Sequence, residues 1–572
     1  MAAVPGMLFP PADSPAEAGA ASGGGRQEPD ARQEGTRSEL FDSSRRDCFT
    51  GGGPEKRGRR DFGLPANAAN PKRGRASPHP TPAGTRSLTS DTQAQRRLSG
   101  SRSPPGPFAW PLVGNVLQLG RLPHLAFGRM ACRYGAVFQL RLGCRRVVVL
   151  NGEAVIRRAL VGLGTRFAGR PDFPSFELVS GGRSVAFGSC SPRWRARRRL
   201  AHAALRARST AAEVERHVAA EAGDLVRLFL RRSQAGTYFE PSPLLVVANA
   251  NVLCALCFGR RYSHTDGEFT ALLGRNDRFG QTVGAGSMVD VLPWLLHFPN
   301  PVRRIFHDFQ ALNQELHGFV RAKVAQHRQS FDPHALRDVS DVMIAAVERG
   351  DRAPEGLGPE DVDGAMTDIF GAGQDTTSTA LSWVLLLLLK HPQLQRDLQA
   401  ELDQVVGRSR LPTAEDRPHL PLLEAFIYET LRYSSFVPIT IPHATTDDVE
   451  LEGFHIPKGT VVFINQWSVN HDCSKWPNPQ RFDPARFLDA QQRLDRDRAG
   501  SVMIFSAGQR RCIGEQLSKL QLFLFTAILL HQCSFHSNPA EHLTMDCVHG
   551  LALKPRPFTV TVRQRHPALI QP

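Results

Sequence analysis

The sequence lacks any run of about 18 apolar residues, so it predicts no membrane-spanning helix. Cysteine is scarce: ten residues at irregular spacing in a chain of 572 exclude a disulfide framework and indicate reduced thiols facing a cytosolic environment. Acidic residues are also outnumbered, since 70 Lys and Arg against 55 Asp and Glu leave a net charge of +15. This excess indicates an acidic partner, an anionic membrane surface or a nucleic acid.

The first 103 residues lack Trp and Tyr and contain only four Phe. Such a Gly-, Pro-, Ser- and Arg-rich segment cannot bury enough apolar surface to offset the entropy of ordering, so we predict that residues 1–103 are a disordered tail. Its early acidic residues argue against a transit peptide, and the missing apolar segment argues against a signal peptide. Its basic clusters lack the interleaved aromatic residues that stack on bases, so we expect no nucleic-acid binding.

Residues 104–572 form one long region without a second linker. Over the whole sequence, 41% of the residues are hydrophobic and 22% are charged, which is enough for a sizeable buried core. Helical periodicity dominates this region, and short strands are predicted at two places. The sequence therefore predicts one large, mainly α domain with a small β portion. The predicted elements are helices at 211–231, 302–326, 361–389 and 516–532, and strands at 137–142 and 146–150.

The most informative segment is Phe505-Ser-Ala-Gly-Gln-Arg-Arg-Cys512-Ile-Gly-Glu515, which precedes an apolar helical run. Gly508 and Gly514 permit a tight loop that a flat, bulky group can approach. Cys512 would lie where backbone N–H groups and a helix N-terminus stabilise a thiolate, and Arg510 can meet an anion beside it. A cysteine alone is usually a core thiol, so the surrounding pattern carries the interpretation.

Three further motifs carry charge or hydroxyl groups. Ala372-Gly-Gln-Asp375-Thr376-Thr stands inside a long apolar helix, where we expect a local widening that opens a groove for a small ligand. Glu429-Thr-Leu-Arg432 puts opposite charges on one helix face. Trp194-Arg-Ala-Arg-Arg198 places an aromatic and a cation four residues apart, which by spacing alone is an ordinary surface turn.

Taken together, these motifs resemble the haem-thiolate monooxygenases of the cytochrome P450 superfamily. Phe-x-x-Gly-x-Arg-x-Cys-x-Gly is that family's haem loop, with Ala507 where many members have a second glycine, and Phe482-Asp-Pro-Ala-Arg486-Phe is similar to a further family segment. The resemblance covers about residues 104–565 and is most similar to family 1, subfamily 1B. It implies the cytochrome P450 fold and haem b as the cofactor.

The resemblance also implies roles for single residues. Cys512 is the axial iron ligand beside Phe505, and the propionate contacts are Trp194, Arg198, His443 and Arg510. Asp375 and Thr376 relay protons to bound dioxygen. Glu429, Arg432 and Arg486 form a buried network that fixes the fold behind the loop. The substrate pocket is lined by Phe187, Asn276, Phe279, Asp368, Gly371, Ala372, Val437 and Leu551.

By the same resemblance, the enzyme is an unspecific monooxygenase of xenobiotic, steroid and lipid metabolism. The expected substrates are planar: polycyclic aromatic hydrocarbons and oestrogens, with retinoids and fatty acids as further candidates. Leu316, where the family has an aromatic residue, and a shortened segment after Leu205 bear on this selectivity. A basic face of Arg193, Arg195, Arg197, Arg199, Arg510, Arg511 and Lys519 would dock NADPH–cytochrome P450 reductase.

The expected location is the cytosolic face of the endoplasmic reticulum membrane (microsomes), held by peripheral contact, with the mitochondrion as an alternative. Two other functions stay open at this point. One is a haem-thiolate isomerase or dehydratase that needs no reductase, which the Asp375–Thr376 pair argues against. The other is a non-catalytic haem-binding protein.

Overall fold

The computed structural model describes residues 102–282, 288–350 and 356–566, with side chains of the first range described up to residue 274. The predicted tail therefore lies outside the described residues except for Arg102 and Ser103. Arg102 already belongs to the folded part, because its carbonyl accepts a hydrogen bond from His455 N–H at 3.0 Å.

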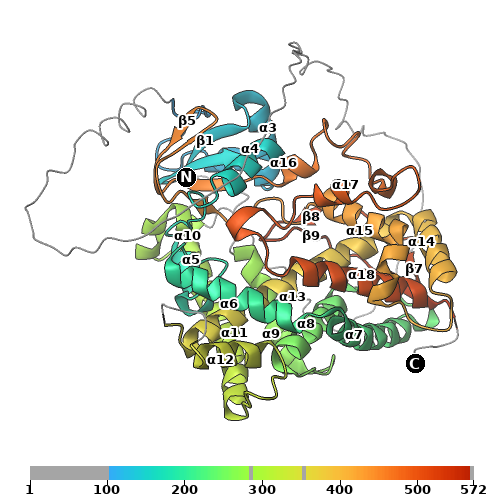
Figure 1. Cartoon of the computed structure of the whole chain (residues 1–572). Coiled ribbons are helices and arrows are strands. Elements are labelled where there is room, and N and C mark those ends of the chain that lie inside the picture. The colour runs from blue at the N-terminus through green and yellow to red at the C-terminus, as the bar shows by residue number, and fades with distance from the viewer. Residues whose placement is uncertain (1–101, 283–287, 351–355, 567–572) are drawn as a thin grey trace, which may run out of the picture. The chain divides into compact units, whose positions relative to one another are not determined.

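The domain is mainly helical, as predicted (Figure 1), and within the described residues the strands form four small sheets. The helices are α2 (Val116–Leu119), α3 (Pro123–Tyr134), α4 (Glu153–Arg157), α5 (Pro174–Leu178), α6 (Pro192–Arg208), α7 (Ala211–Arg232), α8 (Ser242–Phe258), α9 (Gly267–Thr282), α10 (Met288–Val291), α11 (Pro301–Gln329), α12 (Val339–Glu348), α13 (Pro359–Lys390), α14 (Pro392–Val405), α15 (Pro421–Ser434), α16 (Trp467–Asn470), α17 (Arg496–Gly500) and α18 (Glu515–Gln532).

The strands are β1 (Val137–Leu142), β2 (Arg145–Leu150), β3 (His443–Ala444), β4 (Val449–Leu451), β5 (Phe454–Ile456), β6 (Val461–Ile464), β7 (Cys533–Ser537), β8 (Cys547–Val548), β9 (Lys554–Pro555) and β10 (Val560–Gln564). The largest sheet has the order β1-β2-β6-β3. Its β1–β2 hairpin is antiparallel, whereas β2 pairs with β6 in parallel, Val147 opposite Val461. The predicted strands and the four predicted long helices are confirmed, each within three residues at either end.

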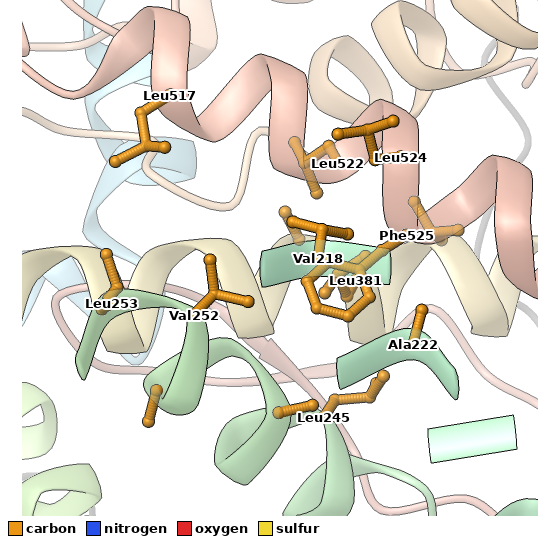
Figure 2. Packing of buried hydrophobic residues seen from close by; sticks show 14 of the residues in the cluster. Val218, Ala222, Leu245, Val252, Leu253, Leu381, Leu517, Leu522, Leu524 and Phe525 are labelled. Atoms are coloured by element: carbon orange, nitrogen blue, oxygen red, sulfur yellow. The ribbon is translucent and has the colours of Figure 1, made fainter. Parts of the chain in front are cut away.

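Helix α13 organises the core. Pro359 at its first turn and the Asp361 carboxylate, which accepts from Gly358 N–H at 2.9 Å, fix its start. Its second half is buried all round, and so are α8 and most of α18, which is expected of helices without a solvent face. Figure 2 shows Leu381 of α13 among Val218 and Ala222 of α7, Leu245 of α8 and Phe525 of α18.

This packing brings distant segments to one place. The loop before α18 lies against the turn after α4, because Gly508 contacts Leu160. The segment between α5 and α6 meets the first half of α13 through Asp368. Among the described residues, no helix is both long and apolar enough to cross a bilayer.

Candidate functional site

The loop that presents Cys512 is shaped by its glycines. Gly508 has φ +68°, and a Cβ there would stand 1.8 Å from the Leu160 carbonyl oxygen, so this position admits only glycine. Ala507 has φ −140°, an extended conformation open to any residue, so alanine fits where many relatives of the motif have glycine. The Cys512 N–H donates to the Phe505 carbonyl at 2.9 Å, which closes the loop.

The Cys512 sulfur faces a cavity of about 310 Å³ inside the domain. The Cys512 side chain is exposed to this cavity. Burial raises the pKa of the thiol, while the Gly514 N–H and the charges of Arg198 and Arg511 favour the thiolate. A metal ion bound at the sulfur would deprotonate it outright.

Residues from both halves of the chain line this cavity. Six of the eight predicted pocket residues do so: Phe187, Asp368, Gly371, Ala372, Val437 and Leu551. The other two, Asn276 and Phe279, belong to α9, but their side chains lie outside the described residues. Leu316 also lines the cavity, and its Cδ2 would be 3.3 Å from a Cβ on Gly371, so these two residues set the width of the cavity at this point.

Three arginines converge on one wall of the cavity: Arg170, Arg198 and Arg510. Burial lowers the pKa of all three, that of Arg510 to about 9, and the positive neighbours lower those of Arg170 and Arg510 further. None of the three has a carboxylate partner among the described residues. Because these guanidinium groups stay protonated, the cluster favours a bound anion.

The arginines are held in place by backbone carbonyls. Arg510 donates to Ala168, Val185 and Gly188, and its guanidinium carbon lies 3.7 Å from the centre of the Trp194 ring. Arg170 donates to the carbonyls of residues 186, 441 and 442, and Arg198 to that of Arg511. Fixed in this way, they suit the two carboxylates of a rigid cofactor.

His443 and Trp194, the remaining predicted propionate contacts, differ in position. His443 lines the cavity; its Nδ1 pairs with the Phe167 carbonyl at 2.8 Å, and its Nε2 is buried without a partner among the described residues. Burial holds the pKa of His443 well below its usual range, and a carboxylate beside Nε2 would oppose that shift. Trp194 lies behind Arg510, and its Nε1–H donates to the Val185 carbonyl at 2.8 Å instead.

These features fit haem. The cavity has a cysteine sulfur on one side, and along its wall buried cations and an orphaned imidazole nitrogen match two propionates. Phe505 is half-buried and lines the same cavity as Cys512. Cys512 would hold the iron, and Arg170, Arg198, Arg510 and His443 would hold the carboxylates.

The acid–alcohol motif lies on α13 and borders the same cavity. Ala372, Asp375 and Thr376 line it, and Ala372 is exposed to it in the middle of a buried helix. The predicted widening is not seen: α13 is α-helical from Pro359 to Lys390, and the Thr376 hydroxyl donates to the Ala372 carbonyl at 2.9 Å. Close packing against α8, where Leu253 lies against Gly373, keeps the helix regular here.

Asp368 combines two roles. It lines the cavity, but its carboxylate accepts from the hydroxyls of Ser180 and Ser184 and from the N–H groups of Val185 and Ala186. Burial raises its pKa, and these four donors oppose that shift. Asp368 therefore fastens the 180–187 segment, which carries Phe187, to α13, and its polar atoms are not free for a ligand.

The predicted charge network lies below the cysteine loop. Arg432 and Glu429 are fully buried and joined by two hydrogen bonds of 2.6 and 2.8 Å, and Arg486 Nε lies 3.1 Å from Glu429. Arg432 also donates to the carbonyl of Asn470, whose side-chain amide pairs with Met503 N–H and carbonyl. Through Met503, the network thus reaches the segment that leads into Phe505.

The predicted basic face is smaller than the sequence indicated. Arg510 is in the cavity wall, and Arg197 is buried near Asp361, which also pairs with Arg193 at 2.8 Å. Arg511 and Lys519 share Glu515. Arg195 and Arg199 are exposed and have no carboxylate partner among the described residues. The alternation of these arginines around α6 explains the result, because only one side of a helix faces solvent.

The structure adds residues that sequence reasoning missed. Arg170 stands alone between Gly169 and Pro171, and Lys554 is far from the other motifs in the sequence, so neither has a spacing signal. Lys554 lies on β9, and its Nζ is 2.6 Å from Asp375 Oδ1. Only the packing of β9 on α13 brings the two together.

Comparison with known proteins agrees with this site. The family model for "Cytochrome P450" matches residues 104–562. Human "Cytochrome P450 1B1" is 54% identical over 482 residues, which is 82% of this chain and 89% of the relative. The mouse protein of that name is 54% identical over 475 residues, covering 81% and 87%. Human "Cytochrome P450 1A1" is 44% identical over 467 residues, covering 80% and 91%.

Proposed function

Because the chain belongs to the cytochrome P450 family, we propose that it is a haem-thiolate monooxygenase acting on planar aromatic and steroid-like substrates. Its electrons would come from NADPH–cytochrome P450 reductase, and the products would be the oxygenated substrate and water. The observation that carries the proposal is one cavity that holds both the Cys512 sulfur and the Asp375–Thr376 pair. When bound, haem b would supply the activation of dioxygen.

The chain's own residues would bind, orient and protonate. Thr376 would offer a hydroxyl at the cavity wall, and Asp375, one residue earlier, is mostly buried and at hydrogen-bonding distance from Lys554. A carboxyl group between a buried cation and the cavity can accept a proton on one side and pass it on the other. Thr376→Ala and Asp375→Asn should each lower the rate of product formation, by up to about 10⁴-fold, with substrate binding retained.

Apolar walls support a planar substrate. Phe187 packs edge-on against Phe176 with ring centres 5.0 Å apart, and Val437, Leu551 and Leu316 complete an apolar lining. A rigid aromatic wall favours flat rings through offset stacking. We expect a polycyclic aromatic hydrocarbon or an oestrogen to shift the haem spectrum on binding. Retinoids and fatty acids are the further candidates, and the absence of any shift with planar ligands would contradict the assignment.

Arg195 and Arg199 support a reductase contact on the cysteine side, because α6 and the Cys512 loop meet through Arg198 and Arg511. Exposed cations steer an acidic partner at long range. Replacing both by Glu should weaken reductase binding and flatten its dependence on salt. Arg496→Glu, an exposed arginine on α17, is the matched control, and equal effects of both changes would argue against this surface.

An apolar surface supports peripheral membrane contact at the endoplasmic reticulum, with its cytosolic face as the proposed location. Phe108 is 74% and Leu112 82% exposed, and Trp294 and Phe298 are also exposed. The segment with Phe108 and Leu112 and the segment with Trp294 and Phe298 both lie next to the β1–β2 turn. In this turn, the Gly143 N–H donates to the Val113 carbonyl and the Cys144 N–H to the Val291 carbonyl. Cell fractionation of the full chain tests this location against the mitochondrion, and Phe108→Ser with Leu112→Ser should reduce binding to microsomal lipid vesicles.

A further inference from the structure

Helix α8 carries two fully buried asparagines in an otherwise apolar surface, Asn249 and Asn251. A buried amide persists only where its hydrogen bonds are satisfied. Asn251 has an evident role in holding the segment that follows the helix: it donates to the Tyr262 carbonyl and accepts from the Tyr262 N–H, each at 2.8 Å. Asn249 faces a different element.

The Asn249 side-chain nitrogen donates to two successive carbonyls of α13, those of Gly373 and Gln374, both at 3.0 Å. Its amide oxygen is buried and has no partner among the described residues. An unsatisfied buried oxygen is unfavourable by about 1–3 kcal/mol, so the side chain is not there for stability alone.

The two carbonyls belong to the turn that directly precedes Asp375 and Thr376. In a helix they also accept from the N–H groups of residues 377 and 378. A second donor from the side draws a helical carbonyl outward and sets the direction of the turn. Gly373 allows this close approach, since a Cβ there would stand 3.0 Å from Leu253 of α8, the residue labelled beside α13 in Figure 2.

Other contacts in this turn are local. The hydroxyls of Thr376 and Ser378 bond back to carbonyls of the same helix, those of Ala372 and Gln374. Such bonds weaken the backbone ladder of a helix. The fastening by Asn249 therefore acts on a turn that contains a glycine and two competing hydroxyls, and that exposes Ala372 and Thr376 to the cavity.

We propose that Asn249 is a positioning residue that ties the Gly373–Gln374 backbone to α8 and thereby fixes how Asp375 and Thr376 face the cavity. The inference rests on the proposed monooxygenase function. Loss of the tie would let the turn shift and admit water. Dioxygen would then take two electrons from the NADPH-reduced flavoprotein and two protons and leave as hydrogen peroxide, without oxygenating substrate.

The test compares Asn249→Leu with Asn251→Leu in the full-length, haem-loaded protein. The two changes are chemically identical and lie on the same helix, but the Asn251 side chain makes its hydrogen bonds with Glu221 and Tyr262. Asn249→Ser, too short to bond both carbonyls, repeats the change in case leucine disturbs packing. Amide hydrogen exchange over residues 372–379 is measured first, followed by product and peroxide formed per NADPH and by substrate binding from the haem spectrum.

We expect Asn249→Leu and Asn249→Ser to speed exchange in this segment several-fold and to raise the peroxide share several-fold, with unchanged substrate affinity. Asn251→Leu should speed exchange near its partners Tyr262 and Glu221, and not over residues 372–379. Unchanged exchange and coupling in the Asn249 variants, or the same changes in Asn251→Leu, would overturn the proposal. A wild-type protein with no NADPH-dependent product would refute the monooxygenase function instead, and the exchange measurement would then still decide whether the tie exists.

Discussion

Lys554 Nζ lies 2.6 Å from Asp375 Oδ1, which joins the short strand β9 to the acid of the α13 motif. Burial raises the pKa of Asp375 to about 7 and lowers that of Lys554 to about 8. The ion pair acts against both shifts, because each charge stabilises the other. We therefore expect Asp375 as a carboxylate and Lys554 as an ammonium at neutral pH, with pKa values close enough for a proton to pass between them.

Replacing Lys554 by Met removes the cation, so the pKa of Asp375 should rise and the carboxyl should be largely protonated at neutral pH. The pH profile of product formed per NADPH should shift, with its Asp375-dependent limb moving to higher pH. Lys390→Met is the matched control, since Lys390 stands on the same helix as Asp375 but donates to the Leu543 carbonyl. An unshifted profile in Lys554→Met would contradict the coupling.

Arg170 predicts a change in cofactor retention. Its guanidinium is buried among carbonyls, and we infer that a propionate supplies its missing anion. Arg170→Gln should speed haem transfer to an apoprotein acceptor roughly ten- to hundredfold, the loss of one charged hydrogen bond. Arg145→Gln, at an arginine that bonds exposed Asp172 and the Asp290 carbonyl but does not line the cavity, should not change this rate. Equal retention in both variants would show that Arg170 does not face the cofactor.

Glu429 predicts a change in stability. Glu429→Ala would leave Arg432 buried without its carboxylate, which destabilises a fold by roughly 3–5 kcal/mol. We expect a lower midpoint of chemical unfolding and less haem incorporated on expression. Asp489→Asn, which removes a pair to the highly exposed Arg493, is the control and should leave the midpoint unchanged. Similar midpoints for both variants would mean that the buried network does not fix the fold.

His327 predicts a dependence of stability on pH. Its Nε2 lies 2.6 Å from Asp338; burial lowers the pKa of His327, but the bond and charge of Asp338 outweigh this, and the net shift is upward. A raised folded-state pKa gives stability that is fully present below about pH 6.5 and is lost as the pH rises through the folded-state value. His327→Gln should therefore reduce the unfolding free energy by about 1–3 kcal/mol at low pH. At about pH 9 the variant should nearly match the wild type, and an equal deficit at both values would contradict this.

Much of the architecture follows from periodicity in the sequence. The long helices α7, α11, α13 and α18 are predicted because each buries an apolar face or is apolar all round. The cysteine loop is predicted because Gly508 has a local steric reason to be there.

What could not be predicted depends on contacts between distant segments. Arg170, Lys554 and Asn249 each act on a partner more than 100 residues away. The regular α13 was also missed, because the sequence shows the residues that weaken a helix but not the α8 side chain that holds it. The burial of Arg197 was missed for the same reason. Its position around α6 follows from the sequence, but the sequence does not show that Asp361 of α13 lies opposite it.

The central claim, that the sulfur of Cys512 holds a haem iron, is tested most directly by the carbon monoxide difference spectrum of the reduced protein. The wild type should show the long-wavelength Soret maximum of thiolate-ligated haem, and Cys512→Ser should lose it. Cys533→Ser, at a buried cysteine outside the cavity, should keep it. A wild type without this band after haem is supplied, or a Cys512→Ser variant that retains it, would contradict the account.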